Sequence, residues 1–385
     1  MIYLDYNATT PLCQEAWEAM LPWLKASEGG YGNPSSIHAL GRRARAAIDD
    51  ARDKWANWLQ VKPHELIFTG GGTESDNLAI LGLARRHCHR GHHLITAATE
   101  HHAVLHAMEF LKKQEGFEIT YLPVDEKGMV KLEQLQDALR PDTILVSIMQ
   151  ANNETGVIQP IAEFTALCHE RNVFFHTDAI QSFGKVRSLP HELGVDAWSI
   201  AGHKFYGPKG VGLLWLRAGT SIQSLHHGGA QEGERRPGTE DVASIVGMTV
   251  AAEVALREVM VGIEASRQRI LREQLWKGIT ALYPGAVRHG LSETTLFNTL
   301  NVSFPGCDGE TLIMALDLEG ICLSSGSACM VGSIQASHVL RAMGVNEEEA
   351  QTAVRFSLGR RTTEEEIVKT LVALKSVLGR QYPFL

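Results

Sequence analysis

A glycine-rich stretch, Thr69-Gly70-Gly71-Gly72-Thr73-Glu74-Ser75, follows a short apolar run and precedes a helical one. Glycines let the backbone approach an anion closely, and the N-terminus of the following helix offers unpaired N–H groups with positive dipole character. Thr73 adds a hydroxyl donor. A phosphate site is one interpretation, and a strand-to-helix turn with a Ser/Thr cap is the other. The spacing matches neither a P-loop nor a dinucleotide fingerprint.

Two more reactive residues follow predicted strands. Asp178, in His176-Thr177-Asp178-Ala179-Ile180-Gln181, lies 26 residues before Lys204, in Gly202-His203-Lys204. Ligands bind outside the carboxyl ends of parallel strands, where both residues are expected. An Asp there can keep a pyridine nitrogen protonated, and a Lys can form a Schiff base where the neutral amine is favoured. Alone, Asp178 could be a helix N-cap and Lys204 a solvated loop residue. Together with the glycine-rich turn, they favour a pyridoxal-phosphate site.

Short β-rich runs alternate with helical stretches from Pro63 to Leu216, which predicts an α/β fold. The mostly parallel seven-stranded sheet should be flanked by helices on both faces. Its predicted strands are Glu65–Phe68, His93–Ala97, Glu118–Leu122, Thr143–Ile148, Val173–His176, Ala197–Ile200 and Val211–Leu216. The predicted helices include Ser75–Cys88, Val104–Gln114, Ile161–Arg171 and a long amphipathic one that carries Ala44, Ile48, Ala51 and Trp55.

A helical region over Val242–Leu282 is predicted to bridge to a second unit. Beyond Pro284 the expected elements are Leu300–Phe304 extended, helices at Gly309–Leu318, His338–Met343 and Glu364–Leu378, and a Gly- and Ser-rich loop between them. We therefore expect a large domain over 13–258. A smaller α+β domain should combine 259–385 with 1–12, because the N-terminal strand Tyr3–Asp5 is predicted to pack there.

Composition excludes several classes of protein. With 385 residues, 44% hydrophobic and 21% charged, the chain suits a two-domain globular protein. A net charge of −8 gives no footprint for nucleic acid or an anionic membrane. No bilayer-spanning run or secretory signal is visible, so a cytoplasmic location is expected. Six cysteines without framework spacing should be free thiols. The run His87–His93 lacks metal-ligand spacing, so no metal is expected.

Several motifs occur in order along essentially the whole chain. They are Asp5-Tyr6-Asn7-Ala8-Thr9-Thr10-Pro11, Gly32-Asn33-Pro34-Ser35-Ser36-Ile37-His38, Gly72-Thr73-Glu74-Ser75, Thr99-Glu100-His101, Asn152-Asn153-Glu154-Thr155-Gly156, Asp178-Ala179-Ile180-Gln181, Gly202-His203-Lys204, Arg236-Pro237-Gly238-Thr239, Ser324-Ser325-Gly326-Ser327-Ala328-Cys329 and Arg355-Phe356-Ser357-Leu358-Gly359-Arg360. In this combination the chain resembles the cysteine desulfurases, a pyridoxal-phosphate family of the class V aminotransferase superfamily with fold type I.

The resemblance implies conversion of L-cysteine to L-alanine, with the sulfur held as a persulfide on Cys329. An acceptor protein, such as an iron–sulfur scaffold, would then take the sulfur for clusters, thiocofactors or tRNA thiolation. Lys204, His101 and Cys329 are the implied catalytic residues. The implied cofactor contacts are Gly72, Thr73, His101, Asn153, Asp178, Gln181, His203 and Lys204, with Thr239 reaching the phosphate of the other subunit in a homodimer. Asn33, Asn153 and Arg355 are the implied substrate contacts, and Arg355 suits a bidentate carboxylate.

One position departs from the family pattern. Many relatives place a Ser hydroxyl on the phosphate where this chain has Ala201, so one donor is lost. The loop that carries Cys329, Ser324–Ser333, is rich in small residues, and we predict that it is mobile.

Two other functions stay open. A selenocysteine lyase, or another pyridoxal lyase of this fold, would not need Cys329. A non-enzymatic sulfur-relay protein would need Cys329 but would not bind pyridoxal phosphate.

Overall fold

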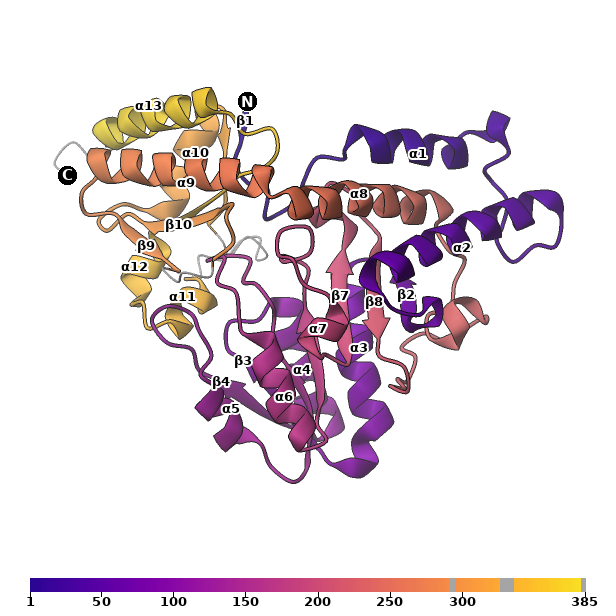
Figure 1. Cartoon of the computed structure of the whole chain (residues 1–385). Helices are drawn as coiled ribbons and strands as arrows, with labels where there is room; N and C mark the ends of the chain where they lie inside the picture. The colour runs from indigo at the N-terminus through magenta and orange to yellow at the C-terminus, as the bar shows by residue number, and fades with distance from the viewer. Residues whose placement is uncertain (291–294, 326–335, 382–385) are drawn as a thin grey trace.

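The computed structural model describes residues 1–290, 295–325 and 336–381. Figure 1 shows a sheet-based part whose helices surround the strands, and a line of two long helices, α8 and α9, that leads to a smaller group of helices and strands. Within the described residues, none of the helices combines the length and apolar character needed to cross a membrane.

The seven-stranded sheet is mostly parallel, as predicted. Its strand order is β2-β8-β7-β6-β5-β3-β4, and only β8 runs antiparallel to its neighbours. The strands are β2 (Leu66–Thr69), β3 (His93–Ala97), β4 (Glu118–Leu122), β5 (Thr143–Ser147), β6 (Phe174–Asp178), β7 (Ala197–Ala201) and β8 (Gly212–Leu216). The predicted strands agree with these bounds within two residues. The loops that follow β6 and β7 therefore open at the same edge of the sheet.

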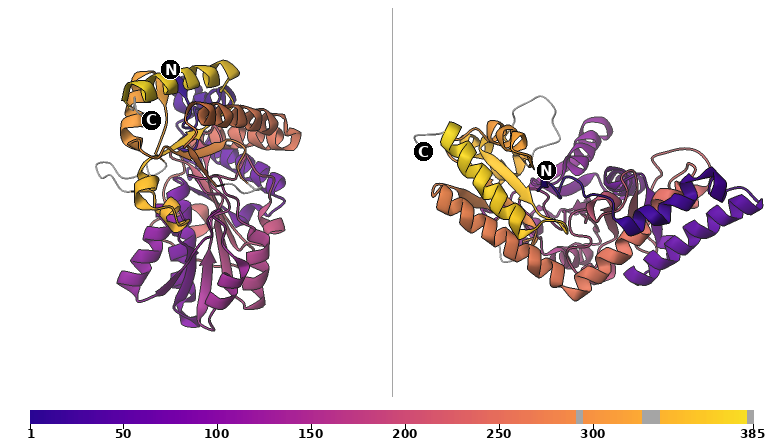
Figure 2. Two further views of the ribbon diagram at one scale, coloured as in Figure 1. Left: turned by 90° about the vertical axis from the view of Figure 1, so that its left-hand side faces the viewer. Right: turned by 90° about the horizontal axis from the view of Figure 1, so that it is seen from above.

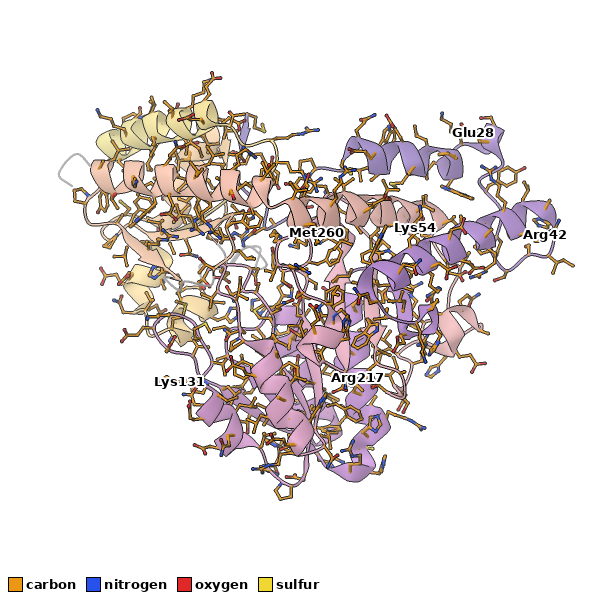
Figure 3. The ribbon with its side chains drawn as sticks, in the orientation of Figure 1. Glu28, Arg42, Lys54, Lys131, Arg217 and Met260 are labelled. Atoms are coloured by element: carbon orange, nitrogen blue, oxygen red, sulfur yellow. The ribbon has the colours of Figure 1, made fainter. Side chains whose placement is uncertain are left out.

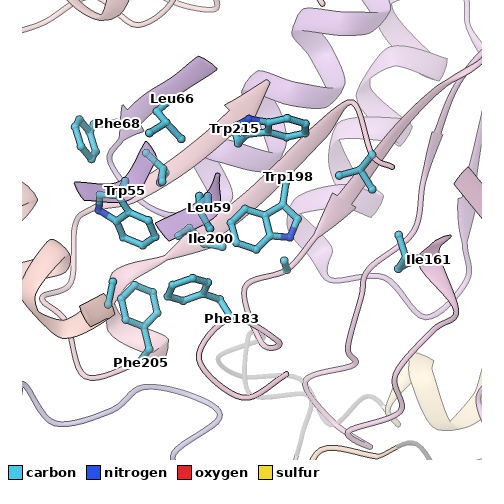
Figure 4. Packing of buried hydrophobic residues seen from close by; sticks show 14 of the residues in the cluster. Trp55, Leu59, Leu66, Phe68, Ile161, Phe183, Trp198, Ile200, Phe205 and Trp215 are labelled. Carbon is cyan, nitrogen blue, oxygen red and sulfur yellow. The ribbon is translucent and has the colours of Figure 1, made fainter. Parts of the chain in front are cut away.

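Alternation along the strands gives the sheet two apolar faces. Ile67 and Leu94 pack with helices α3 (Gly72–His87) and α4 (His102–Glu115), whereas their neighbours Phe68 and Ile95 belong to the core on the opposite face. That opposite face is covered by α2 (Ala39–Leu59), α5 (Leu132–Ala138), α6 (Ile161–Glu170) and α8 (Val242–Val261), with the short α7 (Pro190–Leu193) nearby. Figure 4 shows Trp55, Phe183, Trp198 and Phe205 gathered there.

Helix α3 begins earlier than predicted, at Gly72 instead of Ser75. The backbone N–H of Ser75 donates to the Gly71 carbonyl at 3.0 Å and closes the first turn. Strand β2 ends at Thr69, so only two residues separate strand and helix. Consequently Thr73 lies in the first turn of α3, where backbone N–H groups have no partner inside the helix.

The predicted bridging region is helical, but it consists of two helices instead of one continuous helix. Helix α8 ends at Val261 and α9 (Ile263–Leu282) begins two residues later. Gly262 between them has φ 72°, a left-handed conformation that glycine adopts without a steric cost, and its N–H caps α8 on the Glu258 carbonyl. Figure 3 labels Met260 close to this junction.

A second hydrophobic core lies around a three-stranded antiparallel sheet. Its order is β12 (Ala353–Ser357), β10 (Thr299–Ser303) and β9 (Val287–His289). Strand β1 (Ile2–Tyr3) pairs in parallel with β11 (Ile321–Cys322), and Leu4 is buried in this core, as predicted for the N-terminal strand. The other helices are α1 (Gln14–Leu24), α10 (Gly309–Leu318), α11 (His338–Ala342), α12 (Glu347–Gln351) and α13 (Glu364–Gln381), the last beside α9 in Figure 2. The separate cores support a division near residue 258, which stays a prediction.

Candidate active site

A cavity of about 340 Å³ lies where β6 and β7 end. The predicted site residues that line it are Gly72, Thr73, His101, Asn153, Asp178, Gln181, His203, Lys204 and Arg355. Asn7 and Ala8 from the N-terminal segment, together with Met149, Ile180 and Ala201, complete the wall. The cavity therefore brings together residues that the sequence separates by up to 348 positions, from Asn7 to Arg355.

The end of the cavity at α3 suits a phosphate. A wider hollow of about 830 Å³ shares Gly72, Thr73 and His203 with this cavity, and Lys209 and His226 also line it. Gly72 lies so close to the β6 loop that a Cβ atom here would meet Ile180 Cδ1 at 2.2 Å. A side chain at this position would therefore have to displace Ile180, which lines the same cavity.

His203 has a defined hydrogen bond at this end. Its Nδ1 lies 3.1 Å from the Thr9 hydroxyl. Burial, assisted by the nearby Lys204, lowers the pKa of His203 to about 4, so the ring is neutral near pH 7. A neutral imidazole with one nitrogen at Thr9 keeps its other nitrogen for a ligand.

Asp178 is a buried carboxylate with few nearby groups that stabilise its negative charge. It is the last residue of β6, and its Oδ1 accepts the Ile180 N–H at 2.8 Å. Burial raises the pKa of Asp178 to about 6, against the opposing effects of that N–H and of Lys204. A cationic group beside Asp178 would stabilise the ionised carboxylate, which is what a protonated pyridine nitrogen requires.

Lys204 ends the short turn Gly202–Lys204 that follows β7. Its Nζ donates to the carbonyls of Asn7 at 2.6 Å and Ala8 at 2.8 Å. These two carbonyls belong to the N-terminal segment that precedes the large sheet. The solvated-loop interpretation of Lys204 is therefore wrong, because its amine is held at the cavity wall by two backbone acceptors.

His101 and Gln181 add two polar groups of fixed orientation. His101 caps α4, with its Nδ1 accepting the Ala103 N–H at 3.1 Å, and burial lowers the pKa of His101 to about 4. Gln181 is buried and donates from Nε2 to the Asn7 carbonyl at 2.8 Å. Both side chains present neutral hydrogen-bonding groups to a ring in the cavity.

Arg355 stands at the other end of the cavity, on β12. It is only 3% exposed. Its guanidinium donates to the Asn153 carbonyl at 3.0 Å and to Asp5 Oδ1 at 2.8 Å. Among the described residues, its buried Nε meets no acceptor. A buried unpaired donor is costly, so this edge of the guanidinium is suited to a carboxylate ligand.

Asp5 contributes to the site through Arg355, although the sequence motif that contains it predicted no role for it. It pairs with Arg355 across 350 positions of the chain, and no local pattern marks that pairing. Its place in the family motif Asp5–Pro11 was the one feature of the sequence that could have indicated a role at the site. Lys185 is a further residue next to the site, and no sequence motif singled it out; its amine reaches the Gln181 side chain.

Three predicted residues are not placed at this cavity. Asn33 is exposed, and its Oδ1 accepts the Ser35 N–H at 2.8 Å. Thr239 is also exposed and lies outside the cavity wall of its own chain. Cys329 lies outside the described residues. The roles of all three stay predictions.

The residues present fit pyridoxal phosphate. The first turn of α3 can hold a phosphate, Asp178 can meet the ring nitrogen, and Lys204 supplies an amine at the same wall. Within the residues that the structure describes, no group of three or more His, Cys, Asp or Glu residues could hold a metal.

Comparisons with known proteins agree with this site. The Aminotransferase class-V family matches residues 2–370. Cysteine desulfurase IscS of Dictyoglomus turgidum is 48% identical over 379 residues, which cover 98% of this chain and 95% of the relative.

Two solved structures are also similar. A NifS-like protein, with a TM-score of 0.91 and 40% identity, covers 98% of this chain and 99% of its own. A structure described as SspA in complex with cysteine, with a TM-score of 0.81 and 36% identity, covers 93% and 99%. The chain belongs to the class-V aminotransferase family and, within it, to the cysteine desulfurases.

Proposed function

We propose that this chain is a pyridoxal-phosphate-dependent cysteine desulfurase that converts L-cysteine to L-alanine and passes the sulfur to Cys329. The observation that carries the proposal is a single cavity lined by both Lys204 and Arg355. An amine that can hold the cofactor and a guanidinium that can hold a carboxylate lie there together. The similar SspA structure, which contains cysteine, supports an amino acid substrate.

The cofactor would be held at three points. The first turn of α3, with Thr73 and His203, would bind the phosphate, and Thr239 of the partner subunit in a homodimer would complete this end. Asp178 would bind the ring nitrogen and Gln181 the ring oxygen, while His101 would lie against the ring. When bound, the cofactor supplies an electron sink for the charge that develops at the substrate α-carbon.

Arg355 and Asn153 would orient the substrate. The carboxylate would bind the guanidinium edge of Arg355 whose Nε meets no acceptor among the described residues. This contact would direct the α-carbon towards Lys204, whose amine would take the α-proton. His101 is neutral near pH 7 and its Nδ1 accepts the Ala103 N–H, so its Nε2–H would be the group that donates a hydrogen bond towards the substrate and cofactor.

Cys329 would receive the sulfur. Its thiolate would attack the substrate Sγ, so that a bond forms between the two sulfurs and the bond between substrate Cβ and Sγ breaks. The electron pair of that bond stays with the carbon fragment, which gains a proton and leaves as L-alanine. A sulfur-acceptor protein, such as an iron–sulfur scaffold or a thiolation enzyme, would then collect the persulfide.

The test is incubation of the purified protein with L-cysteine, with and without added pyridoxal phosphate. We expect alanine and protein-bound sulfur in equal amounts in a single turnover, only when the cofactor is present. Alanine from selenocysteine but not from cysteine would favour a selenocysteine lyase. Persulfide formation without the cofactor would favour a sulfur-relay protein.

A further inference from the structure

Lys185 is a half-buried lysine that lies next to the site and has no assigned role. It follows Gln181 by four residues, in the turns after β6. Its Nζ donates to the Gln181 backbone carbonyl at 2.9 Å and lies 3.4 Å from the side-chain Oε1 of the same residue. Lys185 therefore contacts both the backbone and the side chain of Gln181, the residue that is proposed to contact the ring oxygen.

The opposite end of the Gln181 amide is also fixed. Its Nε2 donates to the Asn7 carbonyl at 2.8 Å, and this same carbonyl accepts the Lys204 amine at 2.6 Å. The Lys185 amine donates towards the Gln181 Oε1, and only a donor can face the Asn7 carbonyl. The two contacts together select one of the two orientations of the amide, with its NH₂ group on the side of Asn7 and Lys204.

A second, small cavity of about 60 Å³ is lined by both lysines. The other charged groups on its wall are Glu258 from α8, Glu264 from α9 and Arg360 after β12, and the phenols of Tyr6 and Tyr206 are also present. Burial, with the nearby Lys204 as the next cause, lowers the pKa of Lys185 to about 7. Lys185 is thus an electrostatic neighbour of Lys204.

We propose that Lys185 is a positioning residue, which holds the Gln181 amide so that its NH₂ group is presented to the ring oxygen of the bound cofactor. The inference rests on the proposed function, because it assumes that Gln181 meets this oxygen. Without Lys185, the amide can rotate and place its carbonyl oxygen against the Asn7 carbonyl and the ring oxygen. The ring oxygen would then lose a donor in part of the molecules.

The test uses Lys185→Met, which keeps the length of the side chain and removes the donor and the charge. The readouts are the cofactor dissociation constant and the pH midpoint of the absorbance of lysine-bound cofactor. Loss of a donor disfavours the more negative ring form, so the midpoint should rise by about 0.4 to 1 pH unit. The matched control is Lys54→Met, an exposed lysine of α2 labelled in Figure 3, and it should leave the midpoint unchanged. Lys185→Arg, which keeps a donor and a positive charge, should return the midpoint most of the way to that of the unmutated protein.

A double-mutant cycle separates action through Gln181 from a direct effect on Lys204. In a Gln181→Leu background, Lys185→Met should produce little further shift. A full additional shift there, or no shift from Lys185→Met alone, would overturn the proposal. If the Met variant does not fold, Lys185→Gln gives the same comparison. Absence of a lysine-bound cofactor in the unmutated protein would instead contradict the proposed function.

Discussion

The two ends of the active-site cavity differ in how their ionisable groups are stabilised. At the cofactor end, burial keeps His101 and His203 neutral, with pKa values near 4, and raises the pKa of Asp178 to about 6. At the carboxylate end, Arg355 carries a buried charge that is already paired with Asp5 at 2.8 Å. At the first end, the effect of burial on Asp178 outweighs the opposing effects of Lys204 and the Ile180 N–H, whereas at the second end the charge of Arg355 is paired directly with Asp5.

This difference predicts two kinds of response to mutation. A ligand cation beside Asp178 would offset the cost of burying that carboxylate. A mutation that prevents the cofactor from binding should therefore abolish activity completely. A substrate carboxylate would share Arg355 with Asp5. Mutations at the carboxylate end should therefore weaken substrate binding without abolishing activity. The substitutions below break or sharpen this comparison, from the largest expected effect to the smallest.

Lys204→Ala breaks the cofactor end. The variant should fold, because the Lys204 side chain lines a cavity and its amine donates to backbone carbonyls of Asn7 and Ala8 rather than packing in a hydrophobic core. It should lose the absorbance of lysine-bound cofactor and all turnover of L-cysteine. Absorbance spectra and alanine release measure both effects. A yellow, active variant would refute the assignment of Lys204.

Cys329→Ser tests whether both ends of the cavity can work without the sulfur acceptor. The hydroxyl is a poor nucleophile towards sulfur near neutral pH. The variant should therefore bind cofactor and L-cysteine but form neither alanine nor a protein persulfide. Single-turnover alanine assays, with mass spectrometry of the loop peptide in the unmutated protein, measure these losses. Alanine at the normal rate, or extra sulfur on Cys322, would show that Cys329 is not the nucleophile.

Arg355→Ala breaks the carboxylate end alone. Losing a charge-assisted contact should cost about 1.5–3 kcal/mol, which raises KM for L-cysteine by roughly 10- to 150-fold. Cofactor binding should be retained, because the phosphate and ring contacts lie at the other end. Steady-state kinetics and a cofactor titration separate the two. Arg380→Ala, an exposed arginine of α13 paired with Glu319, is the matched control. An unchanged KM would mean that another residue holds the carboxylate.

Ala201→Ser sharpens the comparison within the cofactor end. Ala201 ends β7 and lines the cavity beside Gly72, so a hydroxyl there could restore one phosphate contact. A neutral hydrogen bond contributes about 0.5–1.5 kcal/mol, which corresponds to roughly 2- to 12-fold tighter cofactor binding. Equilibrium dialysis of both forms measures it. Weaker retention by the Ser variant would show that the pocket has closed around the methyl group.

Much of the large sheet could be predicted from the sequence, because each strand carries its own signal. Runs such as Thr143–Ser147 are short, apolar and β-branched, and the observed strands lie within two residues of the predicted ones. The observed start of α3 lies three residues before the predicted one, at Gly72 instead of Ser75, because glycines are typical of turns and concealed the first helical turn. The break at Gly262 was missed because both flanking segments are helical, and a lone glycine is tolerated inside a helical pattern.

The sequence by itself determined the types of the reactive groups and their place at strand ends: Asp178 after an apolar run, Lys204 after the next one, and glycines ahead of a helix. Periodicity acts over a few residues and sufficed for this. Only the tertiary structure decided that Arg355 on β12 shares a cavity with Lys204 and pairs with Asp5. It also placed β8 antiparallel between β2 and β7 and brought Lys185 onto Gln181. Such neighbours depend on long-range packing of two hydrophobic cores and on chain closure over hundreds of residues, for which no local pattern carries a signal.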